Sequence, residues 1–104
     1  MMKANRAFCK MMGNRREHMP SGIYIEIDNA PSDAKFLVSD ELGTKMGFEL
    51  HHKEVTLESN VSIYRLIGYH AETKYVAPEN VIKYDFRNAT EEEIKTINHY
   101  ACLT

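Results

Sequence analysis

The sequence predicts an α+β fold, in which an antiparallel sheet of four to five strands packs against a C-terminal helix and one or two further short helices. Two patterns lead to this prediction. Residues 22–28, GIYIEID, alternate apolar and polar side chains with the period of a half-buried strand. Residues 88–104 place Thr90 and Glu93 at capping-box spacing ahead of an apolar stripe, which is typical of an amphipathic helix.

Three further strands are predicted after residue 59. The first, residues 60–70, carries apolar side chains on both faces, which indicates a central strand covered on two sides. The second, residues 73–77, is shorter and ends at Pro78. The third, residues 80–86, alternates again, and its inward positions are Ile82, Tyr84 and Phe86.

Two other segments are predicted to be helical. Residues 3–12 gather apolar side chains on one side of a short helix: Ala7, Phe8, Met11 and Met12. Residues 32–47 repeat apolar side chains every four residues, with Ser32 as a cap at the start. For this second segment, a strand over residues 34–38 followed by a turn is an alternative, because Gly43 and Thr44 are poor residues for a helix interior.

A small SH3-like or OB-like β-barrel with a terminal helix is the alternative architecture, since the strands predicted after residue 48 are short. With 104 residues the chain is predicted to be a single domain, residues 1–104. Apolar residues make up 43% and charged residues 27%, which excludes the composition of a disordered chain. The longest apolar runs are far shorter than the roughly 20 residues of a membrane span, so no membrane association is expected.

Charge is distributed unevenly along the chain. Residues 1–20 carry five basic groups and one acidic group, whereas the remainder carries eight basic and fourteen acidic groups. The first 20 residues also hold five of the six methionines, so they are predicted to be a basic, Met-rich arm or a short helix. The two cysteines, Cys9 and Cys102, have no metal-ligand spacing and are expected to be free thiols, which favours a cytoplasmic protein.

The segment FELHHKEVTLE, residues 48–58, contains the sharpest local anomaly. Its apolar side chains occupy even positions before the two adjacent histidines and odd positions after them, at Val55 and Leu57. One extra residue between 51 and 54, a β-bulge, would restore a single inward face. Such a bulge would also turn His51 and His52 in related directions, although packing is the favoured explanation for the pair.

The sequence favours a small, non-enzymatic protein that binds a partner protein and modulates or inhibits it. The candidate binding residues lie in the N-terminal segment: Phe8, Lys10, Met12, Arg15 and Arg16. Nucleic-acid binding by the same basic segment is the first alternative, and a homo-oligomer is also considered. A metal- or histidine-dependent hydrolase ranks third, with weak candidate ligands His51, His52 and His70; no catalytic motif is recognised and no cofactor is expected.

Overall fold

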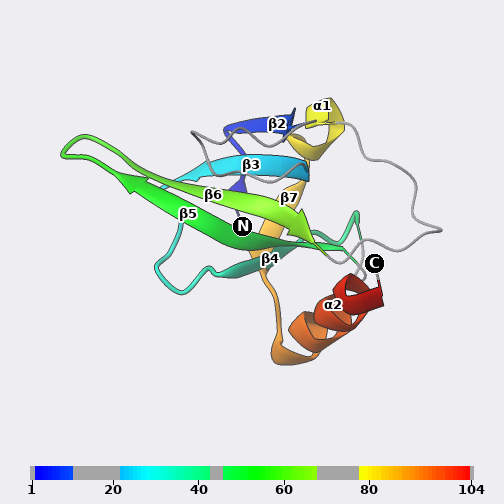
Figure 1. Ribbon diagram of the computed structural model, residues 1–104. Coiled ribbons are helices and arrows are strands. Elements are labelled where there is room, and N and C mark those ends of the chain that lie inside the picture. Colours follow the sequence, from blue (N-terminus) through cyan, green and yellow to red (C-terminus); the bar gives the residue numbers. More distant parts are fainter. Residues whose placement is uncertain (1, 11–21, 43–45, 68–77, 104) are drawn as a thin grey trace.

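The computed structural model describes residues 2–10, 22–42, 46–67 and 78–103, with side chains described up to residue 99 (Figure 1). In these residues, seven strands and two helices occur in the following order along the chain: β1 (Met2–Lys3), β2 (Arg6–Lys10), β3 (Gly22–Asp28), β4 (Phe36–Val38), β5 (Gly47–Val55), β6 (Asn60–Ile67), α1 (Pro78–Val81), β7 (Asp85–Asn88) and α2 (Glu91–Leu103).

All of the strand pairs are antiparallel, and the order across the sheet is β1-β7-β4-β5-β6-β3-β2. The predicted α+β class is therefore confirmed in its coarse form, but the described sheet has seven strands rather than four or five. Among the strands beyond those predicted, β1 and β2 lie at the two ends of the sheet, and the three-residue β4 lies between β7 and β5. Strand β6 lies between β5 and β3, which confirms the predicted central strand.

The N-terminal segment joins the two ends of the sheet. β1 pairs with β7 at one end of the strand order, and β2 pairs with β3 at the other. Only Ala4 and Asn5 separate these two strands; Ala4 is buried, and the Asn5 amide donates a hydrogen bond to the Glu26 carbonyl at 2.8 Å. One extended segment thus draws both edges together, and the sheet forms a half-barrel that is compatible with the barrel alternative.

The main core lies on the concave side of the sheet, here called the inner face. Ile23, Ile25 and Ile27 of β3 point into it, as their alternation predicted. The rings of Phe48 and Phe86 meet edge to face there, with centroids 5.4 Å apart. The Tyr64 hydroxyl donates a hydrogen bond to the Ala34 carbonyl at 2.7 Å, so this buried polar group is satisfied. Burial raises the pKa of the Tyr64 phenol above its ordinary value.

The opposite side of the sheet, the outer face, is covered at one end by α2. Ile97 of α2 is 1% exposed and approaches Gly47 at the start of β5. A Cβ atom at Gly47 would lie 2.6 Å from Ile97 Cδ1, so the missing side chain is what allows the helix this close. The rest of the outer face, toward the β5–β6 turn, holds a small second cluster centred on Tyr24 and Ile63.

The predicted capping box of the C-terminal helix is confirmed. The Glu93 amide donates to Thr90 Oγ1 at 3.2 Å, and the Thr90 amide donates to Glu93 Oε1 at 2.9 Å. Arg87 of β7 donates two parallel hydrogen bonds of 2.8 Å to the Glu93 carboxylate and a third, of 3.1 Å, to Asp40. These bonds to Arg87, the largest cause, lower the pKa of Glu93 to about 2.

Two predicted helices are wrong. Arg6–Lys10 is strand β2, in which Phe8 and Ala7 face opposite sides of the sheet because they pair with adjacent residues of β3. Residues 36–38 are strand β4 and are followed by a turn, as in the alternative considered for that segment. In both places, pairing with a neighbouring strand overrides a weak local helical pattern.

The strand predicted over residues 80–86 is also wrong in its first half. Residues up to Val81 belong to helix α1, which starts at Pro78, where the missing amide hydrogen is tolerated. The strand starts only at Asp85, and Ile82 is 36% exposed rather than inward. The strand predicted over residues 73–77 lies outside the described residues. Neither helix in the described part of the chain is long and apolar enough to cross a membrane.

Candidate functional site

A β-bulge in β5 brings the two histidines to one face of the sheet. Leu50 pairs with Tyr64 and His52 pairs with Ile63, the next residue back along β6, so His51 is the extra residue. This confirms the bulge that was predicted from the change between even and odd apolar positions. It lies at His51, the first residue of the predicted interval 51–54. His52 lies on the outer face because its partner Ile63 does, and His51 also packs there, its ring edge to face with Tyr24 at 5.7 Å.

The histidine rings contact each other directly. His51 Nδ1 and His52 Nδ1 are 2.5 Å apart, and His52 Nε2 lies 3.3 Å from Glu54 Oε1. A carboxylate accepts hydrogen bonds, so the Glu54 contact assigns the proton of a neutral His52 to Nε2. His52 Nδ1 then accepts a hydrogen bond from His51 Nδ1–H. The pair is thus part of a polar chain, Glu54–His52–His51, that lies beside the Tyr24 ring.

Aromatic side chains form the floor of the same face. Phe8 of β2 and Tyr24 of β3 are directly opposite each other, and their rings stack with centroids 5.5 Å apart and planes 14° apart. The Arg6 guanidinium lies 4.5 Å from the centroid of the Phe8 ring. Tyr24 is fully buried, and desolvation is the main reason why its pKa is raised.

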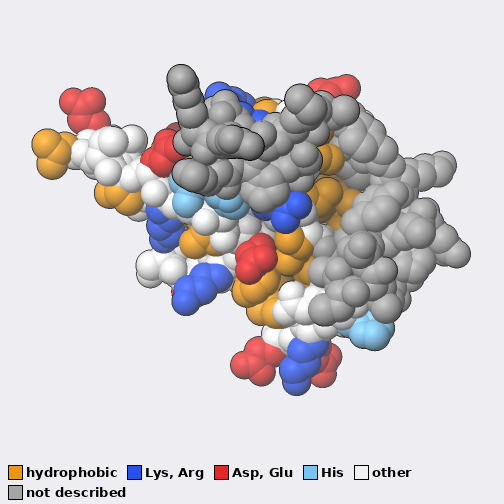
Figure 2. Space-filling view, viewed as in Figure 1, with side chains coloured by type: hydrophobic (Ala, Val, Ile, Leu, Met, Phe, Trp, Pro, Cys, Tyr) orange, Lys and Arg blue, Asp and Glu red, His pale blue; other side chains and the backbone are white. Residues whose placement is uncertain are grey.

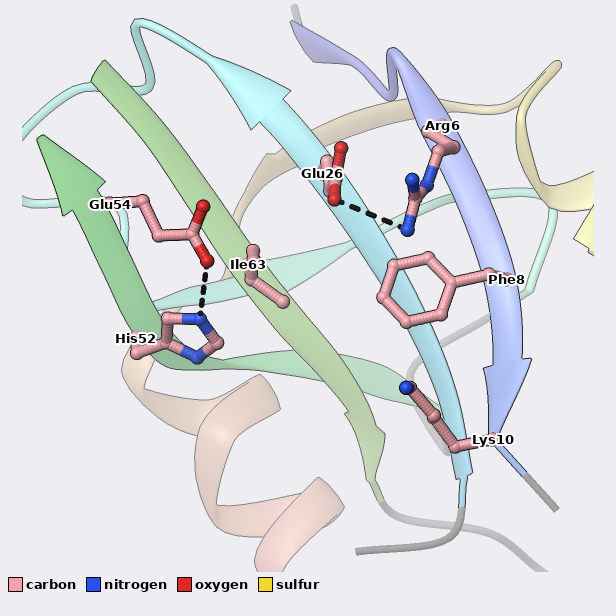
Figure 3. Close-up of a pocket in the computed structure, with 7 residues that line it drawn as sticks. All are labelled: Arg6, Phe8, Lys10, Glu26, His52, Glu54 and Ile63. Atoms are coloured by element: carbon pink, nitrogen blue, oxygen red, sulfur yellow. Dashed lines mark hydrogen bonds and ion pairs between the residues drawn. The ribbon is translucent and has the colours of Figure 1, made fainter. Parts of the chain in front are cut away.

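A shallow hollow of about 240 Å³ lies over this floor (Figure 3). Its lining comes from strands β2, β3, β5 and β6, and consists of Arg6, Phe8, Lys10, Glu26, His52, Glu54 and Ile63. The apolar side chains Phe8 and Ile63 lie between the charged ones in this view. The N-terminal segment and the histidine pair are separate features of the sequence, and in the fold they meet at this hollow.

The hollow carries charges of both signs. Arg6 Nη2 is 3.5 Å from Glu26 Oε1, and His52 contacts Glu54 as described above. Lys10 adds a third basic group at the opposite end of β2 from Arg6. The result is an apolar centre surrounded by basic and acidic side chains rather than a uniformly basic surface. Such a surface suits a ligand that has apolar groups and charges of both signs, as a polypeptide does.

No group of three His, Cys, Asp or Glu side chains among the described residues is arranged to hold a metal ion. His70, the third candidate ligand, lies outside those residues, as do Met12, Arg15 and Arg16 of the predicted binding set. The remaining two members of that set, Phe8 and Lys10, both line the hollow.

Four lining residues are not among the binding or metal candidates given above: Arg6, Glu26, Glu54 and Ile63. For two of them a signal was present. If residues 6–10 are interpreted as a strand, period-two alternation places Arg6, Phe8 and Lys10 on one face. Similarly, a bulge at His51 places His52 and Glu54 on one face. Glu26 and Ile63 join them only through the pairing of β2, β3 and β6, which the sequence does not specify.

The chain matches no protein-family model, and neither the curated proteins nor the solved structures contain a significant match to it.

Proposed function

We propose that this protein is a small, non-enzymatic binding module whose outer-face hollow holds a segment of a partner protein, and that it modulates or inhibits that partner. The observation that supports the proposal is the composition of the hollow. The half-buried Phe8 ring provides apolar contact area beside the buried Ile63, and Arg6, Lys10, Glu26 and Glu54 surround them with both charge signs. Protein interfaces commonly combine an aromatic centre with a polar rim in this way.

The same composition argues against nucleic acid as the ligand of the hollow. A phosphate backbone that approached Arg6 or His52 would also meet the carboxylates of Glu26 or Glu54. The Glu26 carboxylate already pairs with Arg6, and both carboxylates would repel a polyanion. Phe8, the half-buried ring that a base would stack on, is in addition already in contact with Arg6 and Tyr24.

The test is affinity capture with the tagged protein from a lysate of its source cells, after nuclease treatment, with mass spectrometry of the bound proteins. Wild type is compared with Phe8→Ala, which removes the aromatic centre, and with Lys95→Ala, an exposed change on α2 away from the hollow. We expect a stoichiometric protein with wild type and Lys95→Ala, and a loss of at least about tenfold with Phe8→Ala, as for an aromatic interface residue.

Two results would contradict the proposal. Capture that disappears on nuclease treatment would assign the protein to nucleic-acid binding. Equal capture by Phe8→Ala and wild type would show that the hollow is not the binding surface, provided that circular dichroism and thermal unfolding show Phe8→Ala to be folded.

A further inference from the structure

The β5–β6 hairpin projects beyond the rest of the sheet (Figure 1), and one of its two edges has no partner strand among the described residues. On the β6 side, β3 pairs as far as Val61, and the Asn29 amide continues to the Asn60 carbonyl at 2.8 Å. On the β5 side, the pairing with β4 ends at Glu49, and the Leu50 amide makes the last bond, to the Lys35 carbonyl at 2.8 Å. No described residue pairs with this edge of β5 beyond the bulge.

The backbone groups that face the open edge can be identified from the turn. The Thr56 amide donates to the Ser59 carbonyl at 2.8 Å, so Thr56 directs its backbone groups toward β6. Because this direction alternates along an antiparallel strand, Glu54 and His52 also point toward β6, whereas Val55 and Lys53 point away from it. Within the described part of the chain, the N–H and C=O groups of Val55 and Lys53 therefore pair with no other strand.

The side chains beside these groups are exposed and chemically distinct. Val55 is 69% exposed, and Leu57 in the adjoining turn is fully exposed, which gives the end of the hairpin an apolar surface (Figure 2). Lys53 is exposed on the same face as Val55 and has no ion pair within the described part of the chain. On the other face, His52 and Glu54 line the hollow.

We propose that the open edge of β5, residues 52–55, takes up an extended segment of the partner protein as an additional strand. The segment carries an acidic residue opposite Lys53 and an apolar residue opposite Val55, while its other face lies beside His52 and Glu54 at the rim of the hollow. This inference rests on the proposed function and specifies the form of its ligand.

A second copy of this chain fits the edge poorly. Antiparallel pairing of two identical strands places one residue opposite itself at the two-fold axis. An axis at Lys53 opposes two lysines, and an axis at Glu54 opposes two glutamates, and like charges directly opposite each other are destabilising. With the axis at Val55, the pairing could extend only one residue further along the chain, because the turn follows at Thr56. Charge complementarity therefore favours a segment of different sequence.

The experiment starts from a random-peptide phage library selected on the immobilised full chain. A recovered peptide is synthesised with a fluorescent label, and its Kd is measured by anisotropy for wild type and four variants. Lys53→Glu reverses the charge at the edge, Val55→Pro removes an outward amide, Phe8→Ala alters the hollow, and Lys95→Glu is the matched charge-reversal control on α2. Hydrogen exchange then locates the amides that the peptide protects.

We expect recovered peptides to carry an acidic and an apolar residue two positions apart, so that both lie on one face of the added strand. Lys53→Glu should raise Kd about fivefold relative to wild type. A peptide with Lys in place of its acidic residue should instead bind Lys53→Glu more tightly than wild type. Val55→Pro should raise Kd about tenfold, since proline at an outward position spares the β5–β6 pairing but removes a donor for the new strand. Lys95→Glu should leave Kd unchanged. The amides of Lys53 and Val55 should become protected on binding.

Other outcomes overturn the inference in distinguishable ways. If peptides bind and depend on Phe8, but not on Lys53 or Val55, the edge is not used and the proposed function stands. If no peptide is enriched, both the edge and the proposed function fail. If the Lys53 and Val55 amides are protected without peptide, and the protein sediments as a dimer, a second copy occupies the edge. If Val55→Pro does not fold, the Kd values of Lys53→Glu for the original peptide and for the charge-swapped peptide decide the question.

Discussion

The two halves of β5, on either side of the bulge, contain apolar residues on the same inner face and yet differ completely in burial. Phe48, before the bulge, is 1% exposed, whereas Val55, after it, is 69% exposed. Among the described strands, the first half pairs with β4 and β6, and the second half pairs with β6 alone. Alternation thus determines which way a side chain points, but other elements determine whether it is covered.

The largest expected effect separates the two halves by their packing. Phe48→Ala removes a ring that meets Phe86 in the core, and we expect it to lower the free energy of unfolding by about 3–5 kcal/mol. Val55→Ala, the matched truncation in the second half, should change it by no more than about 0.5 kcal/mol. Urea unfolding followed by circular dichroism measures both. Similar losses for the two variants would mean that the hairpin end is covered.

A smaller effect tests how α2 covers the first half. Gly47→Ala places a Cβ atom against Ile97 Cδ1 and the Leu37 carbonyl, so we expect a loss of about 1–3 kcal/mol. Ile97→Val removes that Cδ1 atom. In the double variant, therefore, Gly47→Ala should cost less than it does alone, and a double-mutant cycle measures this coupling. Simple additivity would show that α2 does not lie against Gly47.

The next effect concerns the attachment of α2 and depends on pH. Glu93 has a pKa lowered to about 2 from 4.5, so its ionised form stabilises the folded state above about pH 4.5, and this contribution is lost as pH falls toward 2. Glu93→Gln should cost about 1–2 kcal/mol at pH 7. Melting temperatures of the variant and wild type should converge at low pH. Glu92→Gln, a change of the same kind at an exposed neighbour, is the matched control and should change the free energy of unfolding at pH 7 by no more than about 0.5 kcal/mol.

The smallest effect is expected at the end of the hairpin. Leu57→Ser replaces a fully exposed side chain, so the free energy of unfolding should change by no more than about 0.5 kcal/mol. Thermal unfolding of Leu57→Ser beside wild type provides the measurement. A decrease of more than about 1 kcal/mol in the free energy of unfolding would indicate that Leu57 packs against part of this chain or against a second copy. Leu57 would then not be part of the exposed surface.

Local patterns predicted those elements whose stability is decided locally. The alternation in residues 22–28 and the Thr90–Glu93 capping box each specify a structure within a few residues, and both predictions are confirmed. The parity change around His51 likewise predicted a bulge, because two inward faces of opposite parity cannot share a regular strand. Residues 6–10 and 36–38 were assigned to helices because their strand partners are distant in sequence.

The candidate site was predictable only in part for the same reason. Phe8 and Lys10 were identified from the composition of the N-terminal segment. Their proximity to His52 and Glu54 depends on three successive strand pairings, from β2 through β3 and β6 to β5. Nothing in the sequence of any one strand specifies that order. The exposure of Val55 was missed because alternation contains no information about where the covering elements end.

The N-terminal segment that joins both ends of the sheet has a consequence for the kinetics of folding. Met2 pairs with Phe86, so the half-barrel cannot close until residues from opposite ends of the chain have met. Contacts between residues so distant in sequence require a large loss of chain entropy before they contribute stability, and proteins rich in them fold in about milliseconds to seconds. Until β1 pairs, one edge of β7 has no partner strand, and an unpaired edge of this kind favours aggregation.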